Sequence, residues 1–170
     1  MANGATLQTH WKFCNNCFGL FFFGESPQAD AGVCPDFPGG HIFINPESGD
    51  YALTLSLGGN FESGVRAGQR NWRFCNKCRS LWFNGKPTNG VCAAGDSHTT
   101  EGSGDYALVN QGPNFAGDIG LQRDWRFCSD CFVLWFNGKS TNGVCPAGGG
   151  HNVSGSGDYA LVHDTDSEFN

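Results

Sequence analysis

The chain of 170 residues carries the same cysteine- and aromatic-rich pattern three times, and this repetition limits the folds that it can adopt. The three copies span residues 10–55, 71–110 and 124–163. Self-similarity at a regular spacing is the signature of a repeat architecture. The connectors before the second and third copies also match each other, through an Asn-Phe and a Gln-Arg pair. Because these connectors are long and similar, we predict one compact domain over residues 1–170.

Each repeat contributes three cysteines and one histidine at similar spacings. The first copy has the spacing C-x2-C-x16-C-x6-H, and the other two have C-x2-C-x13-C-x5-H. An odd number of cysteines per unit cannot form a self-contained set of disulfides. A Cys-x-x-Cys turn, joined by Cys and His from a second loop, is typical of a tetrahedral zinc site. We therefore predict three structural zinc ions with the ligands Cys14, Cys17, Cys34, His41, Cys75, Cys78, Cys92, His98, Cys128, Cys131, Cys145 and His151.

Two other interpretations of these cysteines exist: free thiols in an apolar core beside unrelated histidines, and redox-active Cys-x-x-Cys pairs. Threefold recurrence of all four ligands favours the metal. A closed set of four protein ligands leaves no open position for water, which disfavours hydrolytic zinc chemistry. The expected role of the metal is to replace a core that each small unit cannot build alone.

Composition and pattern predict an all-β fold. Aromatic residues make up 14% of the chain, charged residues 15%, and 26 residues are glycine. Three segments of each repeat have strand patterns, and a fourth, short strand is expected between the second and the last, which gives about twelve strands in total. We predict pseudo-threefold symmetry of the trefoil or prism kind. Beads on a string are the alternative, since each zinc ion is able to fold its own unit.

One set of aromatic residues is expected in the core. Trp11, Trp72 and Trp125 each stand two residues before a phenylalanine. Residues two apart share one face of a strand, so we expect each Trp/Phe pair to line the core beside the zinc. A Leu-x-Phe pair in every repeat is interpreted in the same way.

The residue inside each Leu-x-Phe pair must point to the opposite face of its strand. In repeats 2 and 3 it is tryptophan, followed two residues later by asparagine, and a flat apolar ring beside an amide suits a sugar. The alternative is that this face packs against the neighbouring repeat. Repeat 1 has phenylalanine at both positions, so its site is expected to be weaker or differently selective. The candidate sugar-binding residues are Phe21, Trp82, Trp135, Asn84 and Asn137.

The motif Ser-Gly-Asp-Tyr-Ala-Leu also occurs three times. Its aspartate either caps the turn before a strand that the tyrosine anchors, or accepts a hydrogen bond from a sugar hydroxyl. We add the aspartates Asp50, Asp105 and Asp158 to the candidate ligand-binding residues.

Several functions are disfavoured by what the sequence lacks. The net charge is −6 and the ten Lys and Arg residues are scattered singly, so nucleic acid is not expected as a partner. No apolar segment has the length needed for membrane insertion, and the N-terminus has no signal-peptide pattern. We expect a cytoplasmic protein, with release by a non-classical route as the alternative. No nucleophile elbow or phosphate-binding loop occurs, so we do not expect an enzyme.

The pattern W-x-F-C-x2-C, then G-V-C-x-A-G-G-x-H, then G-S-G-x-Y-x-L resembles tandem cysteine-rich modules of bacterial and fungal proteins. Repeats 1 and 2 depart from its middle segment, with Pro-Asp-Phe-Pro-Gly-Gly-His and Ala-Ala-Gly-Asp-Ser-His. Such modules are often non-catalytic parts of hydrolases, and a small protein made only of repeats with shallow sites resembles a lectin. The resemblance implies a multivalent carbohydrate-binding protein whose partners are glycans or glycoconjugates. The cysteine knuckle also resembles that of zinc ribbons, which implies a protein-interaction module as the alternative.

Overall fold

A computed structural model describes residues 6–24, 31–37, 39–44, 50–56, 68–110 and 121–164 of the chain. The matching Asn-Phe pairs of the connectors lie outside these residues. The described part is all-β, and its nine strands hydrogen-bond into one antiparallel sheet with no helix. The strands are β1 Thr6–Phe13, β2 Leu20–Phe22, β3 Asp50–Ser56, β4 Gly68–Phe74, β5 Leu81–Phe83, β6 Asp105–Asn110, β7 Leu121–Phe127, β8 Leu134–Phe136 and β9 Tyr159–Asp164.

In the part of the chain that the structure describes, each repeat contributes three strands, which gives nine and not the expected total of about twelve. Between the second and last strands, where the fourth was expected, the described residues of each repeat form no strand, and the Gly-Val-Cys motif there is irregular. Its valine N–H does not join a strand ladder. It bonds to a carbonyl in the cysteine knuckle of the next repeat, from Val33 to Cys78 at 3.4 Å and from Val144 to Cys17 at 3.3 Å. A single bond of this kind fixes a loop and builds no sheet.

The first two strands of each repeat form a hairpin around the Cys-x-x-Cys knuckle. In repeat 1, Trp11 pairs with Phe22 and Phe13 with Leu20. The knuckle reverses the chain through hydrogen bonds from Cys14 N to Gly19 O and from Phe18 N to Cys14 O, at 3.0 and 2.9 Å. Repeats 2 and 3 have the same register.

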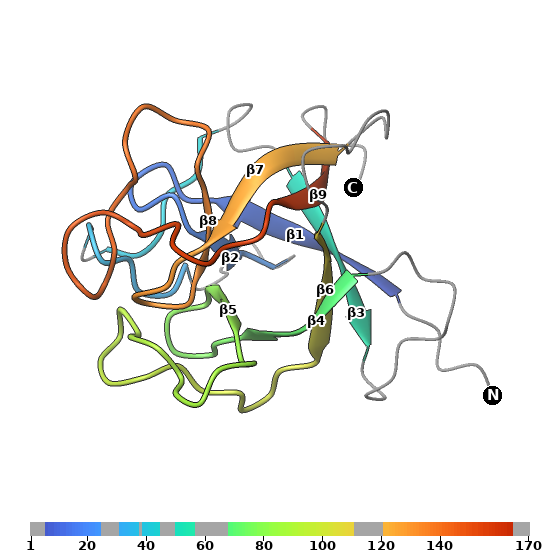
Figure 1. The fold of residues 1–170 in the computed structure, drawn as a ribbon, viewed down its shortest axis with the longest axis horizontal. Coiled ribbons are helices and arrows are strands. Elements are labelled where there is room, and N and C mark those ends of the chain that lie inside the picture. The colour runs from blue at the N-terminus through green and yellow to red at the C-terminus, as the bar shows by residue number, and fades with distance from the viewer. Residues whose placement is uncertain are drawn as a thin grey trace.

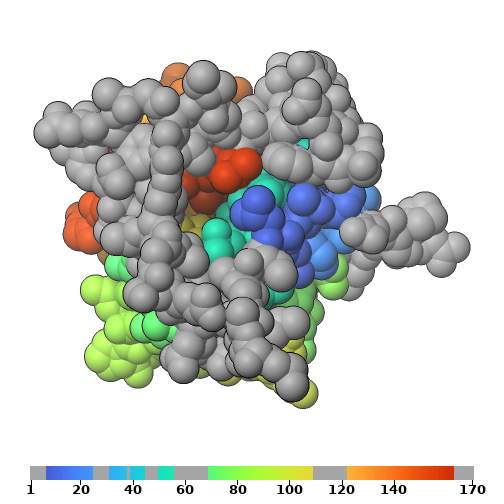
Figure 2. Space-filling view, turned by 90° about the vertical axis from the view of Figure 1, so that its right-hand side faces the viewer, coloured from blue at the N-terminus to red at the C-terminus, as the bar shows by residue number. Residues whose placement is uncertain are grey.

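The third strands of the three repeats close into a ring. Residues 54–56 of β3 pair with 105–107 of β6, 109–110 of β6 with 159–160 of β9, and 162–164 of β9 with 50–52 of β3. Each strand thus pairs through its second half with the first half of the next, which confirms the predicted all-β, threefold arrangement. The loops after β2, β5 and β8 extend to the left in Figure 1, away from this ring. Figure 2 views the ring end, where β1, β3 and β9 lie side by side.

Three glutamines join the repeats inside the ring. The Oε1 atom of each accepts a hydrogen bond from the indole N–H of a tryptophan three residues later, and another from a tyrosine hydroxyl of a different repeat. For Gln122 the donors are Trp125 at 2.9 Å and Tyr51 at 2.7 Å. The same pattern joins Gln8 with Trp11 and Tyr106, and Gln69 with Trp72 and Tyr159.

The central core lies on the axis between the three hairpins. Trp11, Trp72 and Trp125 are 0% exposed there, and each meets a tyrosine of another repeat edge to face, as Trp11 meets Tyr106 with ring centroids 5.3 Å apart. Their predicted place in the core is confirmed. Their predicted place beside the zinc is wrong, because the opposite face of each hairpin covers the cysteines instead.

Candidate metal centres

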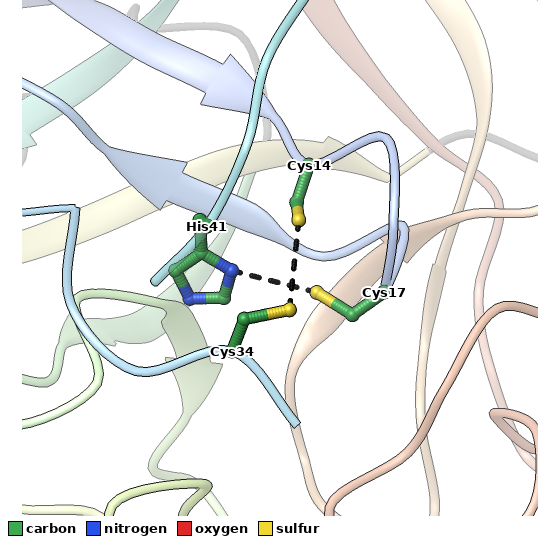
Figure 3. A group of neighbouring side chains, drawn as sticks. All are labelled: Cys14, Cys17, Cys34 and His41. Atoms are coloured by element: carbon green, nitrogen blue, oxygen red, sulfur yellow. Dashed lines mark hydrogen bonds between the residues drawn. The ribbon is translucent and has the colours of Figure 1, made fainter. Parts of the chain in front are cut away.

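Four side chains converge on one point in each repeat. In repeat 1, the first cysteine follows β1, the second lies in the knuckle, and Cys34 and His41 come from the loop after β2 (Figure 3). Cys14 Sγ lies 3.8 Å from Cys34 Sγ, and Cys17 Sγ lies 3.5 Å from His41 Nδ1. The corresponding distances are 3.9 and 3.6 Å in repeat 2 and 3.8 and 3.6 Å in repeat 3.

This geometry fits tetrahedral zinc. With Zn–S bonds of about 2.3 Å and a Zn–N bond of about 2.0 Å, neighbouring ligand atoms of a tetrahedron are about 3.8 Å (S to S) and about 3.5 Å (S to N) apart. All twelve ligands are buried, and the ligand atoms of each cluster lie within 4.8 Å of one another. None of the nine cysteines forms a disulfide. The three predicted clusters are present, and three structural zinc ions fit them.

The clusters are also electrostatically suited to a cation. Hydrogen bonds with Cys17 and Cys34 lower the pKa of the Cys14 thiol far below its usual value. Burial lowers the pKa of His41, but hydrogen bonds with Cys14 and Cys34 outweigh burial and raise that pKa to about 9. The pKa of the Cys17 thiol is raised in turn, first by its hydrogen bond with Cys14, so one negative charge is stabilised in the cluster, and a divalent metal ion favours the remaining thiolates.

A glycine brings each metal-binding loop against the neighbouring repeat. Gly90, just before Val91, has φ +67°, and a Cβ at this position would collide with Cys131 O. Gly143 is equivalent, with φ +66° and Cys17 O as the neighbour. Only glycine satisfies both the positive φ and the close approach. The Gly-Val-Cys motif thus docks each loop on the next knuckle.

The second ring nitrogen of each histidine ligand contacts that same knuckle. Nε2 of His41 lies 3.0 Å from Cys78 O, Nε2 of His98 lies 3.0 Å from Cys131 O, and Nε2 of His151 lies 2.9 Å from Cys17 O. With Nδ1 on the metal, Nε2 carries the proton and donates to the carbonyl. Such a bond fixes the ring orientation of a metal-bound histidine.

The proposed sugar platforms are buried, which corrects their interpretation. Phe21, Trp82 and Trp135 do point away from the central core, but all three are 0% exposed. Trp82 stacks on His98 with centroids 5.2 Å apart and planes at 20°, and Trp135 stacks on His151 in the same way. The alternative of packing against the neighbouring repeat is correct in part: a valine of a neighbouring repeat, Val33 at Trp82 and Val91 at Trp135, packs on this face, and the repeat's own metal-binding loop covers the rest.

Asn84 and Asn137 remain at the surface. Both are partly exposed, and their backbone N–H groups donate to Asn71 O and Asp124 O, each at 2.8 Å. These bonds start the loops 84–89 and 137–142, whose side chains are mostly exposed. The asparagines therefore lie apart from Trp82 and Trp135, which are enclosed.

The recurring aspartates anchor the long strands. Asp50 and Asp105 are 5% and 7% exposed, and their carboxylates accept hydrogen bonds from His10 N at 3.1 Å and Asn71 N at 2.9 Å. These two hydrogen bonds lie where the pairing register shifts, between β1 and β3 for Asp50 and between β4 and β6 for Asp105. Asp158 pairs instead with Arg126, at 2.6 Å. The bonds of Asp50 and Asp105 run to a neighbouring strand, so these aspartates have a structural role that differs from the expected turn cap, and a sugar-binding role is not supported.

The sequence interpretation missed two groups of residues. The glutamines of the ring carried a signal, because Gln-x-x-Trp occurs in all three repeats. The second group is Phe18 and Phe132, which lie partly buried at junctions between repeats. Phe22, Phe74, Phe83 and Phe136 were expected in the core and do pack against it, but their place at the junctions was not expected. No pattern within one repeat reveals this, because each junction combines residues from two repeats.

The chain matches no known family model, and comparisons with curated proteins and with solved structures gave no significant match. In the part of the chain that the structure describes, no helix is long and apolar enough to cross a membrane.

Proposed function

We propose that the protein is a non-catalytic, multivalent carbohydrate-binding protein in which zinc holds the repeats and the junctions between repeats bind sugars. The observation that carries this proposal is a pair of matching aromatic clusters. At the junction of repeats 2 and 3, Phe83 meets Phe127 edge to face with centroids 5.8 Å apart, and Phe127 meets Phe132 at 5.4 Å. At the junction of repeats 3 and 1, Phe136, Phe13 and Phe18 repeat this arrangement at 5.8 and 5.5 Å.

A polar, mostly uncharged loop adjoins each cluster. Loop 84–89 carries asparagine, threonine and lysine side chains, and loop 137–142 carries the same types with an added serine. Lys86 Nζ lies 5.7 Å from the centre of the Phe127 ring, and Lys139 Nζ lies 5.9 Å from that of Phe13. Phe127 and Phe13 are buried, and the partly exposed rings are those that flank them, Phe83, Phe132, Phe136 and Phe18. Such partly exposed aromatic surface beside amide, hydroxyl and ammonium groups suits a sugar, whose apolar face stacks while its hydroxyls form hydrogen bonds.

The junction of repeats 1 and 2 differs. Arg79 stands at the position of Phe18 and Phe132, with its guanidinium 5.2 Å from the centre of the Phe74 ring and 5.7 Å from that of Phe22. Its Nε donates to Phe22 O at 3.2 Å. We therefore expect two equivalent sugar sites and a third junction of different selectivity. Two weak sites on one rigid body gain avidity on a glycan-dense surface.

The natural difference between the junctions suggests a variant that tests this function. Phe18→Arg/Phe132→Arg gives both candidate junctions the arginine that the junction of repeats 1 and 2 already accommodates at the same positive φ. On a glycan array with zinc-loaded protein, wild type should bind and this double variant should not, while its near-ultraviolet circular dichroism stays native. Arg79→Phe is the matched control and should keep binding. Equal binding by wild type and double variant, or no binding by wild type, would contradict the proposal.

A protein-interaction module is the second candidate, and one observation favours it. Phe37 and Ile44 are 44% and 51% exposed in the metal-binding loop of repeat 1, whereas in the described residues the corresponding loop of repeat 3 has one such side chain, Val153 at 43%, and that of repeat 2 has none. Large exposed apolar side chains on one loop suit a protein partner. This function would be favoured if no glycan of a broad array binds, and if a pull-down with wild type captures a protein that the Phe37→Ser/Ile44→Ser variant does not capture.

A further inference from the structure

We propose that the three metal centres form one coupled ring, in which each ion stabilises the ligand set of the next. This inference does not depend on the proposed carbohydrate binding. It rests on where each histidine ligand places its second nitrogen, and on which residue supplies the acceptor.

The acceptor is in every case the backbone carbonyl of a cysteine that is itself a ligand of another centre. Nε2 of His41 in the first centre bonds to the knuckle of the second, His98 in the second to the knuckle of the third, and His151 in the third to the knuckle of the first. The pairs His41–Cys78, His98–Cys131 and His151–Cys17 therefore close a cycle, with distances of 2.9 to 3.0 Å.

The contact between centres is close and buried. Cys78, Cys131 and Cys17 are at most 3% exposed, and each of their carbonyls also accepts the valine N–H of the docking loop at 3.3 to 3.4 Å. A small cavity of about 10 Å³, enough for about one water molecule, lies between the three centres and touches all three histidines. Because these groups are buried, solvent has little access to replace a lost bond.

Loss of one ion therefore affects both neighbours. When the knuckle of centre 2 is released, Cys78 O and the nearby Ser80 Oγ no longer have fixed positions, and His41 of centre 1 loses the two partners of its Nε2, at 3.0 and 3.5 Å. At the same time His98 is freed, and Cys131 of centre 3 loses a buried donor. Removing such partners of a metal ligand typically lowers metal affinity about 10- to 100-fold. We expect a coupling of this size between each pair of centres.

Native mass spectrometry during titration with a zinc chelator measures this coupling. At half removal, independent equal sites would leave about three quarters of the chains with one or two ions. A tenfold coupling between each pair lowers that fraction to about one quarter, and a hundredfold coupling lowers it to a few per cent. The statistical distribution in wild type would overturn the proposal.

Cooperative loss has a competing cause, since unfolding of the whole chain also releases all three ions together. His98→Cys separates the two causes because a fourth thiolate still ligates zinc but carries no Nε2–H to donate to Cys131 O. The comparison requires that the variant still holds three zinc ions and that its circular dichroism spectrum shows a native fold. A tenfold coupling then predicts that the fraction of chains with one or two ions is roughly double that of wild type. Ser97→Cys, which adds an exposed thiol and keeps His98, should behave as wild type.

An unchanged one- and two-ion fraction in folded, fully loaded His98→Cys protein would overturn the coupled ring and assign the cooperativity to global unfolding. If His98→Cys does not fold, the same change at His41 or His151 cuts one of the other two links. A failed glycan array leaves these expectations intact, because their readout is metal occupancy.

Discussion

The three glutamines Gln8, Gln69 and Gln122 lead to a strong prediction about stability, because the side chain of each accepts hydrogen bonds from two buried donors at once. Gln122 Oε1 accepts from Trp125 at 2.9 Å and from Tyr51 at 2.7 Å, and these two partners are 0% and 1% exposed. Tyr51 lies 71 residues away in another repeat, so the bond also holds the ring closed. We predict that Gln122→Ala is among the most destabilising changes of a polar residue in this chain.

The magnitude follows from the two donors. A buried donor without a partner costs about 1–3 kcal/mol, so Gln122→Ala should lower the free energy of unfolding by about 2–6 kcal/mol. Tyr51→Phe removes one donor and leaves the glutamine with its tryptophan, which should cost about 1 kcal/mol. In the Tyr51→Phe background, Gln122→Ala leaves only the indole N–H without a partner. The double-mutant cycle should therefore give a coupling of about 1–3 kcal/mol.

The assay is urea unfolding at a fixed concentration of free zinc, followed by tryptophan fluorescence. The variants should shift the midpoint at constant slope, and Asn76→Ala, an exposed amide on a zinc knuckle, should stay within about 0.5 kcal/mol of wild type. A loss below about 1 kcal/mol for Gln122→Ala, or a coupling near zero, would refute the argument that these donors depend on the glutamine.

Three further predictions follow from the buried contacts. Trp135→Ala should lower the free energy of unfolding by about 3–5 kcal/mol, because the indole fills the space between the hairpin and the metal-binding loop. Thr141→Ala, a change of an exposed residue, should leave it almost unchanged. Equal unfolding midpoints for the two variants would contradict this prediction. Gly143→Ala should weaken zinc binding in a chelator competition, because the new methyl group meets Cys17 O at a positive φ, and an unchanged affinity would contradict it. Burial raises the pKa of Tyr159 to about 12, so the unfolded chain loses this proton first, at about pH 10, and stability should fall between pH 10 and 12. Tyr159→Phe should flatten this part of the pH profile, and an equal slope in both proteins would contradict the assignment.

The sequence alone determined the metal ligands and the strand faces. Three cysteines and one histidine at recurring spacings leave few chemical uses other than a tetrahedral ion, so all twelve ligands were predictable. Alternation along Leu-Trp-Phe likewise determines that Trp82 points opposite to Leu81 and Phe83. These inferences hold because they depend on local geometry and on the preferences of the ion, not on which repeat lies nearby.

What covers each face was decided only by the tertiary structure. The strand pattern leaves open whether Trp82 meets solvent or protein, and the metal-binding loop folded over it removed the expected sugar platform. Contacts between repeats have no local signal either: His151 meets Cys17 at a separation of 134 residues, and Tyr51 meets Gln122 at 71. The physical reason is that closure of the ring selects these partners, because most buried donors pair with an acceptor, which comes from whichever repeat the closed sheet brings beside them.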